Sequence, residues 1–241
     1  MCYHNSINKD SKSIEKKYKA VFPADVIFEP IFHGNGFDFL KWPVIINPNE
    51  KKIKMMHWGL VPSWVKSMED AKKIRAFNLN AKSETVFEKP SFKAAIHSRR
   101  CIIPSTGFFE WKTLNKKKYP YFIFPAEGGF FSLAGIYEQW ADSETGELVN
   151  TFSILTTVAN PLMAEIHNDK KRMPMILPEQ EQENWLEGSI NKAEINQLLK
   201  PFDEKLMLAY PVSKLISTRG VNSNVPEVSK RREDFPKGLF V

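Results

Sequence analysis

Short apolar and alternating runs occupy the chain from about residue 44 to residue 158. Each is rich in β-branched or aromatic residues, and turn-forming residues separate most of them, which is typical of strands. The runs are PVIINP and KKIKMMHWGLVPSW, then CIIPSTGFFEWKT, YPYFIFPA, GFFSLAGIYEQW and NTFSILTTVA. The last four are separated by the turn-rich pieces LNKKK, EGG and ADSETGE. This succession predicts a meander, and therefore a mainly antiparallel sheet.

Helical patterns are shorter and lie on both sides of these runs. KDSKSIEKKYK predicts a helix or a solvated arm, and SETVFEKPSFKAAIHSRR a helix after its proline. NPLMAEIH predicts a short helix with Asn160 as N-cap and Pro161 at the first helical position. PEQEQENWLEG and NKAEINQLLK predict two helices, followed by a strand-like LMLAYPVS. Together the patterns predict one α+β domain over residues 1–241, in which helices flank a mainly antiparallel, twisted or barrel-like sheet core, with a basic tail at about residues 229–241.

Composition and charge narrow the class of protein. The chain is 42% hydrophobic and 26% charged, as expected of a soluble globular protein. It lacks both the run of about eighteen apolar residues that a membrane span needs and an apolar signal core, so we expect no membrane partner. Its two cysteines, Cys2 and Cys101, make no disulfide framework and favour the cytoplasm. The net charge of +6 favours a polyanionic partner such as nucleic acid.

Most standard catalytic motifs are missing. The sequence contains no P-loop, no H-E-x-x-H and no G-x-S-x-G. GNGFDF lacks the third glycine of a dinucleotide fingerprint and predicts a turn. Neither cysteine belongs to a C-x-x-C pair, so zinc is not expected. We therefore predict a protein without metal or cofactor.

The opening residues, MCYHN, place a cysteine second in the chain. If Met1 is removed, Cys2 becomes the first residue and carries both a thiol and an α-amine, a combination that no internal cysteine has. The alternative is an accidental cysteine at a frayed terminus. His4 is the simplest local base for the thiol, or simply part of that terminus.

Three polar positions stand in unusual surroundings. Glu110, in GFFEW, either faces outward on an alternating strand or sits in a hydrophobic pocket, where burial would make it a usable acid at neutral pH. His167 follows NPLMAEI and is either a structural cap or a catalyst. Asn80 and Lys82 lie in NLNAKSETV, which also reads as an ordinary helix start.

Five blocks in order resemble the SOS response-associated peptidase (SRAP) family over nearly the whole chain. They are the initial MC, then HWGLVPSW, NAKSETV, RRCIIPSTGFFEWK and IH…RMPMIL. The resemblance implies a protein that binds single-stranded DNA containing an abasic site and cross-links to it through the N-terminal cysteine, as a thiazolidine. A one-to-one adduct needs no second subunit, so we expect a monomer, associated with the nucleoid when bound to DNA.

The resemblance also implies roles for individual residues. It makes Cys2 the nucleophile and Asn80 the residue that orients it. Glu110 would move protons during ring opening and imine formation, and His167 would assist the opening of the sugar ring. The implied DNA contacts are Lys82, Thr156, Arg172, Trp58, Trp64 and Trp111. Core packing is the alternative for the three tryptophans.

The chain departs from the family pattern at three points. MCYHN replaces the usual MCGR, so an early arginine is missing. Lys82 stands where arginine is usual and keeps the charge without the bidentate fork. NDKK separates His167 from Arg172, where the family commonly has IHDRMP.

Two other functions remain open at this point. A thiol-dependent peptidase could recruit Cys2, His167 and Glu110, and the family's peptidase name reflects release of the residues that precede the cysteine. A non-catalytic module could bind single-stranded DNA through basic and aromatic residues alone. Lyase activity is a further outcome of the same chemistry, because an imine intermediate can undergo β-elimination.

Overall fold

The computed structural model describes residues 2–47, 52–188 and 190–232. Its strands are β1 (His4–Ile7), β2 (Ile31–Asn35), β3 (Lys41–Ile45), β4 (Ile53–Trp58), β5 (Asn80–Lys82), β6 (Arg100–Ser105), β7 (Gly107–Leu114), β8 (Lys117–Pro125), β9 (Phe131–Ala141), β10 (Leu148–Val158), β11 (Arg172–Pro174) and β12 (Met207–Pro211). Its α-helices are α1 (Ser11–Tyr18), α2 (Met68–Phe77), α3 (Ala95–Ser98), α4 (Pro161–Ile166), α5 (Gln182–Leu186) and α6 (Lys192–Leu198). Short 3-10 turns join several of them.

Two sheets form the body of the molecule. One has the strand order β12-β8-β7-β1-β2. The other runs β11-β10-β4-β3-β6-β9, and β9 pairs again with β10, so that five of its strands close into a barrel. Among the named strands of the described ranges, the pairings of β10 with β4 and with β5 are parallel and the others are antiparallel. The predicted α+β class with a mainly antiparallel, barrel-like core is confirmed.

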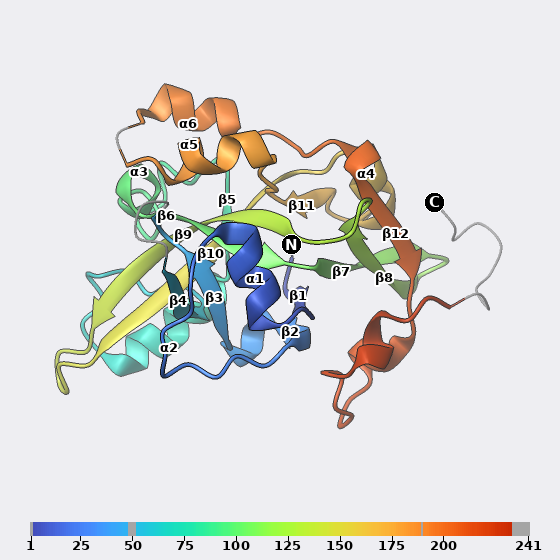
Figure 1. Ribbon diagram of the computed structural model, residues 1–241, viewed down its shortest axis with the longest axis horizontal. Helices are drawn as coiled ribbons and strands as arrows, with labels where there is room; N and C mark the ends of the chain where they lie inside the picture. Colours follow the sequence, from blue (N-terminus) through green and yellow to red (C-terminus); the bar gives the residue numbers. More distant parts are fainter. Residues whose placement is uncertain (1, 48–51, 189, 233–241) are drawn as a thin grey trace.

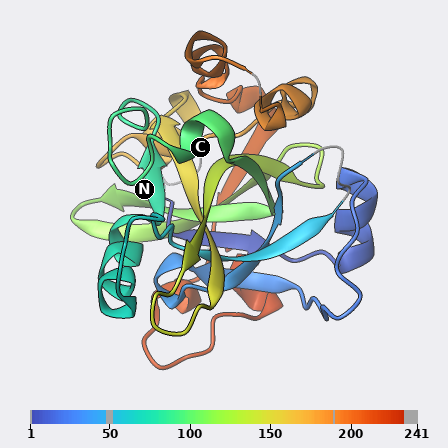
Figure 2. The same cartoon turned by 90° about the vertical axis from the view of Figure 1, so that its left-hand side faces the viewer.

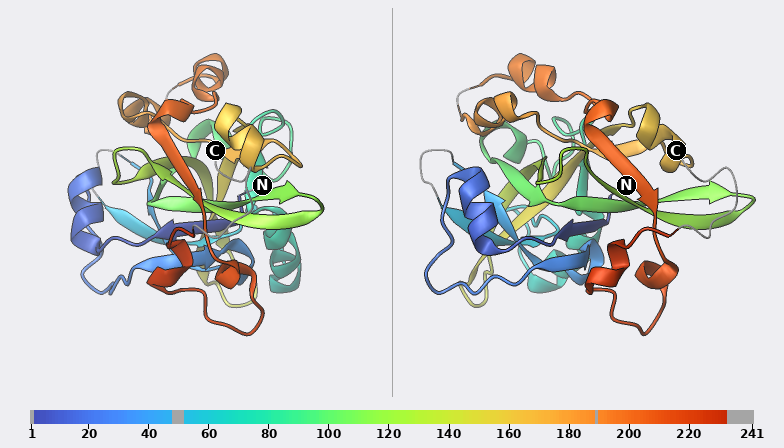
Figure 3. Two further views of the ribbon diagram at one scale, coloured as in Figure 1. Left: turned by 90° about the vertical axis from the view of Figure 1, so that its right-hand side faces the viewer. Right: turned by 45° about the vertical axis from the view of Figure 1, so that its right-hand side comes forward.

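Helices cover the outside of the sheets (Figure 1). The pair α5 and α6 lies on the opposite side of the strands from α2, as the view turned by 90° also shows (Figure 2). Figure 3 shows the segment after β12, in red, below the β7–β8 hairpin, where Asn224 accepts hydrogen bonds from the N–H groups of Phe32 and His33 on β2. No helix within the described ranges is long and apolar enough to cross a membrane.

Local sequence explains several element ends. The predicted cap of α4 is confirmed, because Asn160 Oδ1 accepts the N–H of Met163 at 2.9 Å and Pro161 opens the helix. The lysine-rich stretch forms α1, capped by Asp10. The helix predicted after Pro90 is confirmed only at Ala95–Ser98, and turns occupy the residues before it.

Strand β1 and the basic tail are the two parts of the chain for which the prediction is not confirmed. Strand β1 was not predicted, because HNSI carries no run of apolar residues. It forms because β2 and β7 pair with it on its two edges. Of the predicted basic tail, residues 229–232 are described, and residues 233–241 and Met1 lie outside the described residues.

Candidate active site

Strand β1 brings the start of the chain to strand β7. His4 pairs with Phe109 and Asn5 with Phe108, so Cys2 lies beside the next residues of β7. The side chain of Cys2 is 1% exposed, and its thiol donates to the carbonyl oxygen of His4 at 3.9 Å. Burial, together with the nearby carboxyl group of Glu110, raises the pKa of the thiol. Cys2 is thus a protonated thiol that needs a proton acceptor before it can react.

Glu110 lies on β7, opposite Tyr121 of β8. Its side chain is buried, and the neighbouring residues of β7 are covered on both faces of the sheet. The outward-facing alternative for Glu110 is therefore wrong. Burial raises the pKa of Glu110 to about 8, so the carboxyl group is mostly protonated at neutral pH and can donate a proton.

His167 follows α4 directly and faces Glu110. Its Nδ1 lies 2.8 Å from the carbonyl oxygen of Arg172. Because a carbonyl only accepts, the hydrogen of the neutral ring must be on Nδ1, and Nε2 keeps its lone pair. Nε2 lies 3.9 Å from Oε2 of Glu110. Burial lowers the pKa of His167, so a neutral base stands beside a neutral acid.

Strand β10 gathers four more of the predicted residues. On β5, Asn80 pairs with Ile154 and Lys82 with Thr156. On the other side, β11 brings Arg172, whose Nη2 donates to the backbone oxygen of Thr156 at 2.7 Å and to its hydroxyl at 3.1 Å. Thr156 is fully buried, so its hydroxyl holds Arg172 in place.

Asn80 carries an unusual amide group. The side chain is 8% exposed, and neither Oδ1 nor Nδ2 has a hydrogen-bond partner among the described residues. An unpartnered buried amide costs about 1–3 kcal/mol. The neighbouring residue, Leu79, packs against Gly36, whose N–H donates to the backbone oxygen of Tyr3 at 2.7 Å. These contacts connect the start of β5 with the residue that follows Cys2.

The two cationic candidates differ in their surroundings. Both terminal nitrogens of Arg172 also bind the carboxylate of Glu84, so this guanidinium is already neutralised. Lys82 is exposed, and no ion pair is seen for it within the described part of the chain. A phosphate would meet Lys82 directly but would compete with Glu84 for Arg172.

The three tryptophans lie in different environments. Trp58 is 1% exposed, its indole N–H donates to the carbonyl oxygen of Leu79, and its ring stacks on Phe152. Trp58 is therefore a core residue rather than a DNA contact. Trp111 is half-buried with an edge against His4. Trp64 is 56% exposed and, with the exposed Phe77, lines a hollow that also contains Lys66 and Lys73.

Sequence reasoning missed two neighbours of these residues. Glu84, the partner of Arg172, looked like the first turn of a helix. His33 was missed because nothing in the sequence pairs it with His4, yet Nε2 of His33 lies 2.8 Å from Nδ1 of His4. Burial lowers the pKa of His4 to about 3. The ring of His4 is thus held by His33, and only its backbone oxygen contacts the Cys2 thiol.

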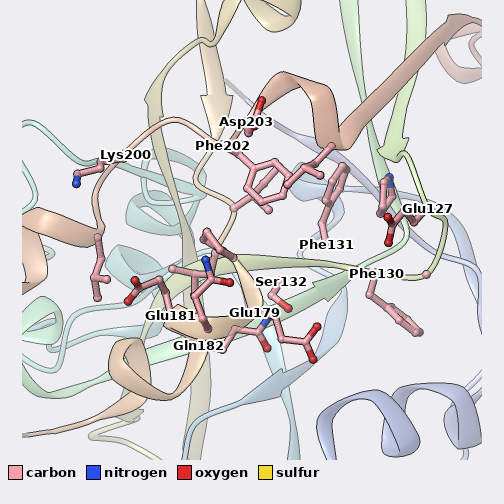
Figure 4. Close-up of a pocket in the computed structure, with 18 of the residues that line it drawn as sticks. Glu127, Phe130, Phe131, Ser132, Glu179, Glu181, Gln182, Lys200, Phe202 and Asp203 are labelled. Atoms are coloured by element: carbon pink, nitrogen blue, oxygen red, sulfur yellow. The ribbon is translucent and has the colours of Figure 1, made fainter.

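A cavity of about 750 Å³ lies away from all these groups, between the β8–β9 turn and the helices α5 and α6 (Figure 4). None of the predicted site residues lines it. Its charged lining residues are Glu127, Glu179, Glu181, Asp203, Lys17 and Lys200. The excess of carboxylates would repel phosphates, so this cavity is no candidate for a nucleic-acid site.

Comparison with known proteins gives concordant matches. The family model described as SOS response associated peptidase (SRAP) matches residues 1–219. The abasic site processing protein YoqW of Bacillus subtilis (strain 168) is 38% identical over 182 residues, 75% of this chain and 78% of that protein. The abasic site processing protein HMCES of Gallus gallus is 31% identical over 200 residues, 74% of this chain and 57% of that protein. A crystal structure of a protein from Bacteroides thetaiotaomicron has a TM-score of 0.89 and 42% identity, and the match covers 96% of this chain and 100% of that one.

Proposed function

This chain belongs to the SRAP family, and from this membership we propose that it processes abasic sites in single-stranded DNA by forming a covalent link through Cys2. The observation that carries the proposal is the meeting of a buried thiol, a protonated carboxyl group and a neutral imidazole beside β7. Proteins with 38% and 31% identity to this chain are named abasic site processing proteins.

The proposed reaction joins two groups of Cys2 to one carbon of the sugar. Once Met1 is removed, the free α-amine, with a pKa near 8, is partly neutral and nucleophilic at physiological pH. The open-chain abasic sugar presents an aldehyde at C1′. The amine attacks this carbon, a C=N bond forms, and the aldehyde oxygen leaves as water. The C=N bond is an iminium at this stage, because its nitrogen keeps one hydrogen of the amine. The thiol then gives up its proton to the Glu110 carboxylate, sulfur bonds to the carbon, the C=N electron pair moves to nitrogen, and a five-membered thiazolidine closes.

Glu110 and His167 supply the proton transfers in this scheme. Glu110, protonated at neutral pH, donates to the departing oxygen and then, as a carboxylate, accepts the proton of the Cys2 thiol. His167 offers the lone pair of Nε2, which suits the removal of a proton from the sugar hydroxyl as the ring opens. Asn80 contributes a buried amide whose hydrogen-bonding capacity is available to orient the terminal amine.

A different set of side chains binds the single-stranded DNA. Lys82 and Arg172 supply cationic groups for phosphates beside the edge of β10. Trp64 and Phe77 supply exposed rings on which bases can stack. Lys66 lies beside them, whereas Lys73 is paired with Glu69 at 2.6 Å and Asp70 lines the same hollow. A peptidase is disfavoured, because its nucleophile needs a lowered thiol pKa and burial raises that of Cys2.

The test is to mix the protein lacking Met1 with a single-stranded oligonucleotide that carries one abasic site. We expect a heat-stable adduct on a denaturing gel, with an intact mass equal to the sum of the two reactants less one water. Cys2→Ala and a form with extra residues before Cys2, shown by intact mass to be uncleaved, should give no such adduct. An oligonucleotide with a tetrahydrofuran in place of the abasic sugar has no aldehyde and serves as the matched control. Absence of the adduct with wild-type protein would overturn the proposal.

A further inference from the structure

The segment after α4 is fastened to an open edge of β7. Strand β7 pairs with β8 along its length, but with β1 only from Gly107 to Phe109. Strand β1 begins at His4, so within the described ranges the strand pairing on that edge stops at Phe109. At Thr113, the side chain of Asn168 takes the place of a strand partner. The N–H of Thr113 donates to Asn168 Oδ1 at 3.0 Å, and Asn168 Nδ2 donates to the carbonyl oxygen of Thr113 at 2.8 Å.

Two further bonds strengthen this attachment. The hydroxyl of Thr113 donates to Asp169 Oδ2 at 2.9 Å. Lys112, with a side chain 9% exposed, donates to Glu165 Oε1 at 2.6 Å. Glu165 precedes His167 in the chain, and Asn168 and Asp169 follow it. The segment is therefore held to β7 on both sides of the histidine.

His167 depends on such anchors because it lies outside regular structure. It is the C-cap residue of a six-residue helix, and the loop that follows turns back through Lys171, which has a left-handed φ of 49°. Its ring is held through Nδ1 by the carbonyl oxygen of Arg172. The distance from Nε2 to Glu110 then depends on how the loop is seated on β7, the strand that also carries Glu110.

We propose that Asn168, through its two hydrogen bonds to Thr113, is a positioning residue that holds His167 at its distance from Glu110. This inference rests on the proposed function. Asn168 does not touch the reacting groups; it fixes the loop that carries one of them to the strand that carries the other. Asn168 and Asp169 belong to the NDKK segment that departs from the family pattern. The proposal gives this segment a function, which is to place His167 relative to Glu110. A misplacement of about 1 Å can cost about 100-fold in rate.

The experiment compares wild type with Asn168→Ala in single-turnover adduct formation at saturating abasic DNA. We expect a rate at least about 10-fold lower, with unchanged affinity for the tetrahydrofuran oligonucleotide. Asn168→Asp keeps an acceptor for Thr113 N–H and loses the donor, so it should give an intermediate rate. Asn191→Ala is the matched control, because Asn191 also makes two side-chain bonds to backbone, at the distant start of α6, and the rate should not change.

Two readouts separate positioning from general destabilisation. In a His167→Ala background, Asn168→Ala should have no further effect on the rate, because its target is already gone. The imidazole of His167, followed by NMR, should titrate at a different pH in Asn168→Ala, since its distance to Glu110 changes. This titration needs no adduct, so it tests the inference even if the proposed function fails. A wild-type titration curve, or a full additive loss in the His167→Ala background, would overturn it.

Discussion

The buried group of Cys2, Glu110 and His167 and the two exposed side chains of Lys82 and Trp64 differ in burial. Cys2, Glu110 and His167 are each less than a tenth exposed. Burial raises the pKa of the thiol and of the carboxyl group and lowers the pKa of the imidazole, so it favours the neutral form of all three. Lys82 is exposed, and the side chain of Trp64 is more than half exposed. The first group suits proton transfer in a site with little water, and the second suits a charged polymer that arrives with its counterions. Chemistry and binding can therefore be altered separately.

The largest effect should come from Glu110→Gln, which keeps the shape and removes the acid. We expect adduct formation to slow by about 100-fold or more, with little change in affinity for the tetrahydrofuran oligonucleotide. In wild type the contribution of Glu110 to the rate should fall as the pH rises through about 8, because the donor form of Glu110 is lost. The terminal amine gains nucleophilicity over the same range, so the check is the ratio of the wild-type rate to the Glu110→Gln rate between pH 6 and pH 9. That ratio should fall through about pH 8, and a constant ratio would count against Glu110 as the acid.

The same substitution should raise stability. The pKa of Glu110 is about 8 in the folded chain, against 4.5 for an ordinary glutamate side chain, so the folded state holds this proton more tightly. Its stabilising contribution is complete below about pH 4.5 and is lost as the pH rises through about 8, at roughly 1.4 kcal/mol per pH unit. Glu110→Gln should therefore unfold at a higher temperature than wild type at pH 8 and at nearly the same temperature at pH 4.5. Exposed Glu144→Gln is the control, and an equal shift at both pH values would contradict the argument.

The sequence predicted those parts of the fold that local chemistry decides. Strands β8, β9 and β10 follow from their β-branched and aromatic runs, and α4 from Asn160 and Pro161 at its start. The single predicted run CIIPSTGFFEWKT is wrong in one respect, because it divides into β6 and β7, which lie in different sheets. Strand β1 and the closure of the barrel by β4 and β10 depend on pairing between distant segments, which no local pattern records. Similarly, the short run that contains Trp58 fits a core position and a DNA contact equally well, and only its burial decides.

In the candidate site, too, the sequence indicated individual residues but not the contacts that they make with other segments. The sequence pointed to Cys2, Glu110 and His167, but it could not show the tautomer of the histidine, which depends on a carbonyl oxygen five residues later. It also missed Glu84, because the bond to Arg172 spans 88 residues. Asn168 was visible only as part of a departure from the family pattern, since its partner lies on another strand.

The next effect concerns Asn80, a buried residue on β5, the strand that also carries the exposed Lys82. Replacement by leucine, of similar shape, removes an amide that has no partner among the described residues. We expect stability to rise by about 1 kcal/mol and adduct formation to slow by about 10-fold, as the terminal amine loses its orienting group. Thermal unfolding and single-turnover rates check the two effects. Asn150→Leu, at the far end of β10, is the control. A less stable Asn80→Leu would mean that the amide has a structural partner.

The smallest effect tests the binding surface alone. Glu84→Gln removes the carboxylate that neutralises Arg172, so the guanidinium becomes available to a phosphate. Exposed ion pairs contribute at most about 1 kcal/mol, so we expect single-stranded DNA to bind about threefold more tightly. The affinity should also depend more steeply on salt, because one more cation takes part. Glu227→Gln, which frees Lys230 on another part of the surface, should change neither quantity. The rate of adduct formation at saturating DNA should stay at the wild-type value. A change in that rate would mean that Arg172 also takes part in the chemistry, and the separation between the two regions would then fail at this residue.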